Sequence, residues 1–288
     1  MTRFLDLRVN PGGPPLAKTV AVNQWTGQSY QSMPLGDLQN DVRGKHVLIG
    51  THGFNVNRQD GINSLSSWES LLQLGSSAVF VGLLWPGDSV WLQALSYPEE
   101  PRIANDAGEL IGPWIEQNFA DAASISLASH SLGARVILEA ISSMTRQVRR
   151  CTLMAGAIDD NCLTAEFQKS AARIGQISVL ASKSDAVLGK AFPIGNILGG
   201  IIAAGHPWFH TALGRSGPSK PWPANFEAPF QIPDQWDFGH HNYLEVDPTH
   251  PAIPVPTDLP PQGAPEPSNG ATGWTEAFSA AFASTRFR

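Results

Sequence analysis

The chain has 288 residues, of which 42% are hydrophobic and 15% charged, and its formal net charge is −6 at pH 7. This acidic balance excludes the basic face of a nucleic-acid-binding protein, and no run of Lys or Arg indicates attachment to an anionic membrane surface. A chain of this length can bury roughly 75% of the surface of its unfolded form, so we expect a large core that needs no disulfides.

The two cysteines are expected to be reduced thiols. Cys151 opens a predicted strand and Cys162 follows the end of that strand. At roughly 3.3 Å per residue the two are too far apart to bridge. Reduced thiols, and an N-terminus without the apolar stretch of a signal peptide, predict a cytoplasmic protein. Residues 187–205 are the best candidate for a membrane span, but they contain Lys190, Pro193 and several glycines, so we predict no transmembrane segment.

Short apolar runs alternate with amphipathic stretches through the middle of the chain. The apolar runs predict buried strands at residues 46–51, 78–85, 124–129, 151–158 and 176–182. The amphipathic stretches predict helices at residues 64–75, 104–119, 131–144 and 164–174, and Pro113 should kink the second of them. Apolar strands separated by helices predict an α/β fold with a mostly parallel sheet and helices on both faces.

The composition divides the chain into three parts. Residues 1–44 read as an irregular approach segment with one or two edge strands, and residues 45–245 form the main domain. Within that domain, residues 187–215 are an apolar, Gly-rich insertion, which is either a helix packed on the sheet or a cap over an apolar pocket. Residues 246–288 are a Pro-rich tail that either wraps the surface or is disordered.

Polar residues follow the predicted strands at their carboxyl ends. They include His52-Gly53, the stretch from Trp85 to Asp88, Ser131, Asp159-Asp160 and Ser184-Asp185. Ligands of parallel α/β sheets bind at this edge. The placement therefore predicts a functional site there.

Ser131 lies where a predicted strand changes directly into a helix. A serine on such a sharp turn projects its hydroxyl clear of the sheet and aims a helix N-terminus at a developing oxyanion, as a nucleophile requires. The turn needs small neighbours, and here Ser129 and Gly133 flank it, so Ser129 replaces the first glycine of the pattern G-x-S-x-G. The alternative is a serine that only caps a helix.

A nucleophilic serine of this kind needs two backbone amides to hold the oxyanion. A His-Gly turn after the strand 46–51 supplies one, from Phe54, and Leu132 next to the serine supplies the other. We expect His52 itself to brace the turn through hydrogen bonds.

The acid that accompanies the serine is expected at the end of a later strand. Asp185 follows the strand 176–182 and is the preferred candidate. Asp159 and Asp160 follow the preceding strand and remain alternatives, although they could instead cap a helix.

The base is expected last in the chain. His240 and His241 lie together on a predicted loop, and two neighbours cannot easily face one site. We prefer His240 and keep His241 as the alternative, while His206, His210 and His250 lie in weaker contexts. The histidines show no tight ligand spacing, so no metal site is predicted.

Four motifs in order resemble the α/β-hydrolase superfamily. They are THGFNVN, LLWPGDS, SHSLGARV and SKSDAVL, and together they look most like a bacterial group of serine hydrolases. The resemblance covers roughly residues 45–245. It implies a central sheet of about eight strands and a Ser131–Asp185–His240 triad, with His240 shortly before an aromatic residue, here Tyr243.

The expected activity is cleavage of an acyl ester through an acyl-enzyme intermediate, without a cofactor. The apolar insertion favours small or lipid-like esters of apolar acids or alcohols, as for a carboxylesterase or a lipase. The alternatives are an acyltransferase or thioesterase on the same fold, or a binding domain without catalysis. The sequence does not indicate an oligomeric state.

Overall fold

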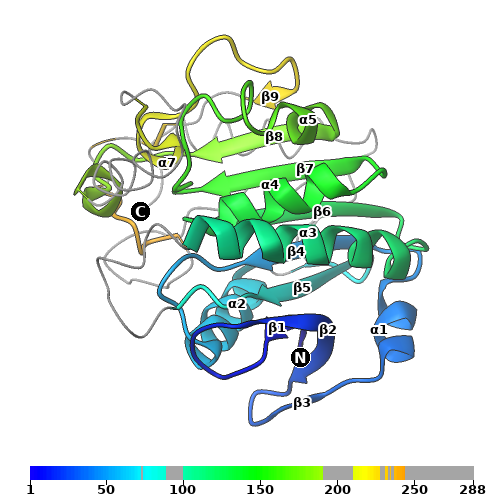
Figure 1. Ribbon diagram of the computed structural model, residues 1–288. Coiled ribbons are helices and arrows are strands. Elements are labelled where there is room, and N and C mark those ends of the chain that lie inside the picture. The colour runs from blue at the N-terminus through cyan, green and yellow to red at the C-terminus, as the bar shows by residue number, and fades with distance from the viewer. Residues whose placement is uncertain are drawn as a thin grey trace.

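The computed structural model describes residues 1–72, 74–88, 100–190, 210–227, 231–232, 234 and 237–243. In this part of the chain, strands form one sheet in the spatial order β3-β2-β1-β5-β4-β6-β7-β8-β9 (Figure 1). All neighbouring strands from β1 to β9 in this order are parallel, and at the other edge β2 pairs antiparallel with both β1 and β3. The predicted α/β fold with a mostly parallel sheet is confirmed.

The N-terminal residues are more regular than the sequence predicts. They form three strands and a helix, namely β1 (Thr2–Arg8), β2 (Leu16–Trp25), β3 (Tyr30–Ser32) and α1 (Leu35–Val42). β1 is an interior strand between β2 and β5, not an edge strand. The sequence hides this position because Asp6 and Arg8 interrupt the apolar pattern, and both are buried with charged partners.

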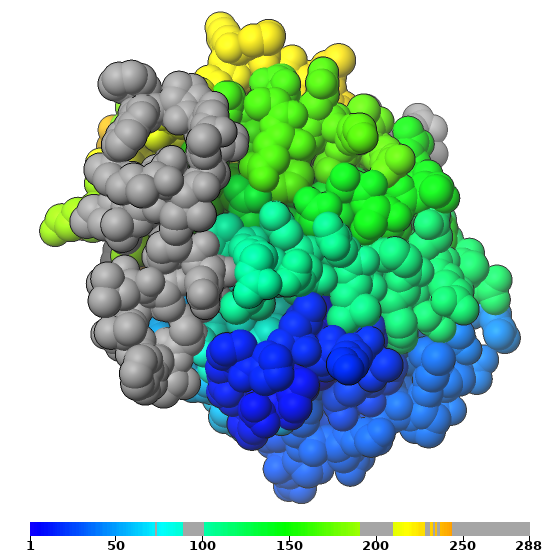
Figure 2. All heavy atoms as spheres, in the orientation of Figure 1, coloured from blue at the N-terminus to red at the C-terminus, as the bar shows by residue number. Residues whose placement is uncertain are grey.

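The N-terminal residues pack against the rest of the molecule and belong to the same core. In Figure 2 they run from dark to lighter blue and border the cyan and green surface formed by the middle of the chain. The side chains of Phe4, Leu5 and Leu7 are fully buried in the common core. β1 is therefore packed as tightly as the strands that the sequence predicts.

The next helices cover opposite faces of the sheet. β4 (His46–Thr51) is followed by α2 (Arg58–Leu72) and β5 (Ala78–Leu84), and then by α3 (Glu100–Asn118) and β6 (Ser124–His130). The chain moves from β4 to β5 in one direction along the sheet and from β5 to β6 in the other. Because parallel crossovers are right-handed, α2 lies on one face and α3 on the other.

The second half of the sheet grows in one direction. Its elements are α4 (Gly133–Ser143), β7 (Val148–Met154), α5 (Gln168–Ala172), β8 (Ile174–Leu180), α7 (Leu213–Ser216) and β9 (Phe226–Glu227). α4 packs against α3 and α5, and in Figure 1 all three lie in front of the sheet. α3 is a single helix through Pro113.

β7 is displaced from its predicted range, 151–158. It begins at Val148, because the buried side chain of Arg150 is neutralised by Glu227 across the sheet, with 2.8 Å between Nη1 and Oε2. It ends at Met154, because Ala155 turns the chain with a φ of 46°. The first residues after the strand can therefore lie beside the end of β6.

Cys151 and Cys162 are both buried and unbridged, as predicted. Among the described residues, no helix has the length and apolar character that crossing a membrane requires. The centre of the predicted insertion, residues 191–209, and the tail from residue 244 lie outside the described residues. The division into the three parts 1–44, 45–245 and 246–288 stays a prediction.

Candidate functional site

Ser131 occupies the two-residue turn between β6 and α4. Its backbone has a φ of 54°, the left-handed region that costs a residue with a side chain roughly 1–2 kcal/mol. The turn is held from β7, since the Ser131 amide donates to the carbonyl of Met154 over 2.9 Å and the Ala157 amide donates to the carbonyl of Ser131 over 3.2 Å. Ser131 is 6% exposed, so the residue is almost completely buried.

His240 joins Ser131 to Asp185. Its Nε2 lies 3.0 Å from Ser131 Oγ, and its Nδ1 lies 2.7 Å from Asp185 Oδ2. A carboxylate only accepts hydrogen bonds, so a neutral ring donates from Nδ1 and accepts the serine proton at Nε2. The three residues form one directed chain of hydrogen bonds although they are 55 and 109 positions apart.

The carboxylate of Asp185 is held at both of its oxygens. The side chain is fully buried just after β8, and the Leu188 amide donates to Oδ1 over 2.8 Å while His240 binds Oδ2. The carbonyl of Asp185 also accepts a hydrogen bond from Arg215. These contacts leave the carboxylate little freedom to turn away from the histidine.

The alternative candidates lie apart from Ser131 or have other partners. His241 is exposed, and its ring stands at 87° to the ring of His240. Asp160 binds His210 instead, with 2.7 Å between Oδ1 and Nδ1, and Asp159 pairs through its backbone with Ala212. The structure thus joins Ser131, Asp185 and His240, and none of these hydrogen bonds involves His241, Asp159 or Asp160.

The turn after β4 lies directly against the serine. A Cβ added to Gly53 would meet Ser131 Cβ at 2.7 Å, so only glycine permits this approach. The amide of Leu132, next to Ser131, has no hydrogen-bond acceptor among the residues that the structure describes. Phe54 follows Gly53 on the same turn, so both predicted oxyanion donors lie on segments that border Ser131.

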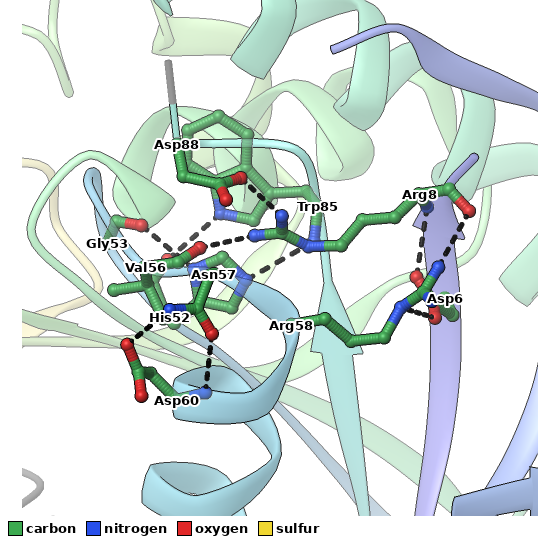
Figure 3. A network of polar contacts seen from close by, with 10 residues as sticks. All are labelled: Asp6, Arg8, His52, Gly53, Val56, Asn57, Arg58, Asp60, Trp85 and Asp88. Carbon is green, nitrogen blue, oxygen red and sulfur yellow. Dashed lines mark hydrogen bonds and ion pairs between the residues drawn. The ribbon is translucent and has the colours of Figure 1, made fainter. Parts of the chain in front are cut away.

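His52 braces this turn, as the sequence predicts. Its Nδ1 donates to the carbonyl of Gly53 over 2.8 Å, and its Nε2 accepts the backbone N–H of Trp85 over 3.3 Å (Figure 3). The Trp85 indole stacks on the ring and donates to the carbonyl of His52 over 3.0 Å. Burial, and then the positive charge of Arg8, lower the pKa of His52 to about 3, so the ring is neutral.

A buried arginine connects three loops at this edge of the sheet. Arg8 leaves the end of β1, and its guanidinium binds the carboxylate of Asp88 after β5 and the carbonyl of Val56 after β4 (Figure 3). The Asn55 amide donates to the carbonyl of Gly87 over 2.7 Å and joins the last two loops directly. The Gly53 turn is therefore held by groups at the ends of β1 and β5.

A second arginine completes the network. Arg58, at the start of α2, lies 2.9 Å from Asp6 Oδ2 through its Nε and donates to the carbonyl of Arg8 over 3.3 Å. Asp6 in turn accepts from the Arg8 amide over 2.9 Å and from the Tyr30 hydroxyl over 3.1 Å. Every charge that β1 brings into the core thus has an oppositely charged partner.

Sequence reasoning missed the burial of Arg8 and the contact of His130 with the backbone of His240. An arginine at a strand end carries no signal of burial, because its partners are 48 and 80 positions away. His130 could have been suspected from its place next to Ser131. Among the described residues, no group of three or more His, Cys, Asp or Glu side chains could hold a metal ion.

Comparisons with known proteins give one family. A family model described as an alpha/beta hydrolase of unknown function (DUF900) matches residues 31–208, more than half of the chain. No curated protein matches the sequence.

The solved structures to which the chain is similar are distant in sequence. TT1662 from Thermus thermophilus is 15% identical over 81% of this chain and 91% of that chain, with a TM-score of 0.40. Esterase PE8 is 15% identical over 55% and 80%, with a TM-score of 0.36. MenH from S. aureus is 10% identical over 72% and 90%, with a TM-score of 0.34. The family of this chain is assigned from the family model and not from these solved structures.

The Arg8 network yields a prediction about stability. The Arg8→Met variant leaves the Asp88 carboxylate buried without its partner, so we expect the free energy of unfolding to fall by about 3–5 kcal/mol in denaturant titrations. The Arg8→Met/Asp88→Leu double variant should recover much of this loss. Arg3→Met is the matched control on the same strand: its pair with Asp41 is partly exposed, so we expect a loss of about 1 kcal/mol or less. Equal losses for both single variants would contradict this interpretation.

The buried ring of His52 yields a prediction about pH. The folded state keeps this ring neutral down to a pKa of about 3, whereas the unfolded chain takes up a proton below about pH 6.5. Stability from this group is complete above pH 6.5 and is lost as the pH falls, by about 1.4 kcal/mol per pH unit. The His52→Asn variant should lose this slope. Denaturant titrations at pH 7, 6 and 5 would measure it, and parallel curves for the two proteins would refute the assignment.

Proposed function

The chain belongs to the family of alpha/beta hydrolases of unknown function (DUF900), and on this premise we propose that it is a serine hydrolase that cleaves carboxylic esters. Ser131 is the nucleophile, His240 the general base and Asp185 the carboxylate that orients the base. The hydrogen-bond chain through His240, with 3.0 Å to Ser131 Oγ and 2.7 Å to Asp185 Oδ2, is the observation that carries the proposal.

In the first half of the reaction, Ser131 Oγ attacks the carbonyl carbon of the ester. His240 Nε2 takes the serine proton as the bond forms, and Asp185 stabilises the imidazolium that results. Because Nδ1 is already bonded to the carboxylate, the ring needs no reorientation at this step. His240 then gives the proton to the alkoxide oxygen, and the alcohol leaves.

The tetrahedral oxygen is held by the amides of Leu132 and Phe54. Leu132 stands at the N-terminus of α4, where unpaired amides and the helix dipole favour a negative charge. Preorganised donors of this kind lower the barrier to acyl transfer strongly, because they stabilise the charge that develops on this oxygen. The bracing of the Gly53 turn by His52, Trp85 and Arg8 keeps the second donor near its place.

In the second half, water hydrolyses the acyl-enzyme. His240 takes a proton from the water, and the acid is released as Ser131 recovers its proton. The side chains alone supply these proton transfers, so the proposal names no cofactor.

The substrate class rests on the sequence. The apolar insertion 187–215 favours small or lipid-like esters of apolar acids or alcohols, as for a carboxylesterase or a lipase-like enzyme, and its centre lies outside the described residues. A thioesterase or an acyltransferase would share the acyl-enzyme and differ in leaving group or acceptor. A hydrolase-like binding domain would lack turnover. A cytoplasmic location, expected from the reduced thiols, also stays a prediction.

The nucleophile can be tested with p-nitrophenyl esters of increasing acyl length. We expect Ser131→Ala to lower kcat by about 10³-fold or more, because the alanine side chain cannot form the acyl-enzyme. Ser129→Ala is the matched control: this hydroxyl is buried two residues earlier and has no hydrogen-bond partner among the described residues, so kcat should change little. A fluorophosphonate should label Ser131. Labelling at another residue, or activity that survives Ser131→Ala, would refute the assignment.

The base and the acid can be tested in matched pairs. We expect His240→Ala and Asp185→Asn each to lower kcat by at least about 10³-fold, since the first removes the base and the second its orientation. His241→Ala and Asp160→Asn should stay within a few-fold of the wild type, because His241 is exposed and Asp160 binds His210. If His241→Ala lowers kcat more than His240→Ala, His241 is the base; if Asp160→Asn lowers kcat more than Asp185→Asn, Asp160 is the acid.

A further inference from the structure

One histidine outside the proposed mechanism contacts the nucleophile turn, the base loop and the oxyanion turn. His130 immediately precedes Ser131 at the end of β6. Its Nε2 lies 2.7 Å from the carbonyl oxygen of His240, and the two rings lie 4.8 Å apart between centroids. On another side, its Nδ1 would lie 3.2 Å from a Cβ added to Gly53.

The donor in this contact is unambiguous. A carbonyl oxygen only accepts hydrogen bonds, so Nε2 of His130 carries the proton. Desolvation by its surroundings, and then the ring of His240, lower the pKa of His130 well below its ordinary value. The ring is therefore neutral, its one N–H is committed to the carbonyl, and Nε2 is not available for proton transfer with a substrate.

The contact holds a loop that is compact in itself. Residues 237–243 form a turn in which the Gly239 amide donates to Asn242 Oδ1 over 2.7 Å and the Asn242 amide donates to the carbonyl of Gly239 over 3.3 Å. These bonds shape the turn but do not tie it to the sheet. The hydrogen bond from His130 does so, across 110 positions of sequence.

One of the two hydrogen bonds of the His240 side chain does not persist through a reaction, whereas the bond to Asp185 does. The bond between Nε2 and Ser131 Oγ is lost when the serine becomes acylated, and Nε2 must then face the leaving group and water. The bond from His130 goes to the backbone of the same residue and takes no part in proton transfer. Together with Asp185 it can therefore hold the imidazole in place while the partner of Nε2 changes.

We propose that His130 is a positioning residue, which sets the place of the His240 imidazole relative to Ser131 by its hydrogen bond to the His240 carbonyl. The proposal rests on the proposed serine-hydrolase function. Because His130 and Ser131 are adjacent in the chain, the residue next to the nucleophile then also holds the backbone of the base, His240. A displacement of the base by about 1 Å could cost about 100-fold in rate.

Two amide variants separate this role from simple packing. In His130→Gln the side-chain amide nitrogen can take the position of Nε2 and still donate to the carbonyl. In His130→Asn the amide atoms lie near the position of Nδ1 and cannot reach it. Both side chains are neutral, polar and smaller than the imidazole, so a merely structural role predicts similar losses for both.

We expect His130→Gln to keep kcat within about 3-fold of the wild type and His130→Asn to lower kcat by about 10- to 100-fold, with KM within about 2-fold in each. The readouts are kcat and KM on p-nitrophenyl esters below the Tm of each variant, and the rate of Ser131 labelling by a fluorophosphonate. Equal kcat values for the two variants, or a loss that appears only in KM, would overturn the proposal.

Crystal structures of both variants give a test that does not depend on activity. The distance from His240 Nε2 to Ser131 Oγ, 3.0 Å here, should persist in His130→Gln and lengthen in His130→Asn. An unchanged distance in His130→Asn would overturn the inference about His130 alone. If instead the wild-type protein neither hydrolyses the esters nor reacts with the fluorophosphonate, the proposed function fails, and the two failures are distinguishable.

Discussion

The left-handed backbone of Ser131 is the constraint on which the arrangement of the site depends. With a φ of 54°, the chain leaves β6 and enters α4 within two residues, so the hydroxyl stands clear of the sheet while the helix starts beneath it. The conformation is unfavourable by itself and persists because Met154 at the end of β7 and Ala157 just after it form hydrogen bonds with the turn. The early end of β7 matters here, since Ala155 turns the chain toward Ser131.

The surroundings of this turn are built from contacts that tolerate little change. The Gly53 turn approaches Ser131 so closely that a single added carbon would collide with it. The His52–Trp85 pair and the guanidinium of Arg8 hold that turn from two neighbouring strands. Buried ion pairs contribute less to stability than their Coulomb attraction suggests, because both ions lose their hydration. The ion pair of Arg8 instead fixes the geometry of this edge, because one guanidinium connects the loops after β1, β4 and β5.

The structure also explains how one site draws on distant parts of the chain. In a parallel sheet the carboxyl ends of all strands reach the same edge, so residues after β4, β5, β6 and β8 meet there. His240, the proposed base, lies on a loop near the end of the described residues, beyond β9. Among the described residues this loop does not directly follow a strand, and the hydrogen bond from His130 to the His240 carbonyl connects it to the end of β6.

The features that depend on near neighbours could be predicted from the amino-acid sequence. The apolar strands, the strand–serine–helix turn at Ser131 and the His-Gly turn at Gly53 each have a local pattern, because strand and helix periods and the need for small residues act over a few positions. The ranges of β4, β5 and β6 were accordingly close to the predicted ones. The order of the candidate acid and base was also visible in the chain.

Which side chains meet depends on the fold as a whole. Asp160 and Asp185 both follow buried strands, and His240 and His241 are neighbours, so no local pattern separates them; the fold pairs Asp160 with His210 and Asp185 with His240. The interior place of β1 was hidden for the same reason, since its charged residues are compatible with burial only through partners far along the chain. A charged side chain can be buried only together with its partner, and the fold brings the two partners together from distant positions of the chain.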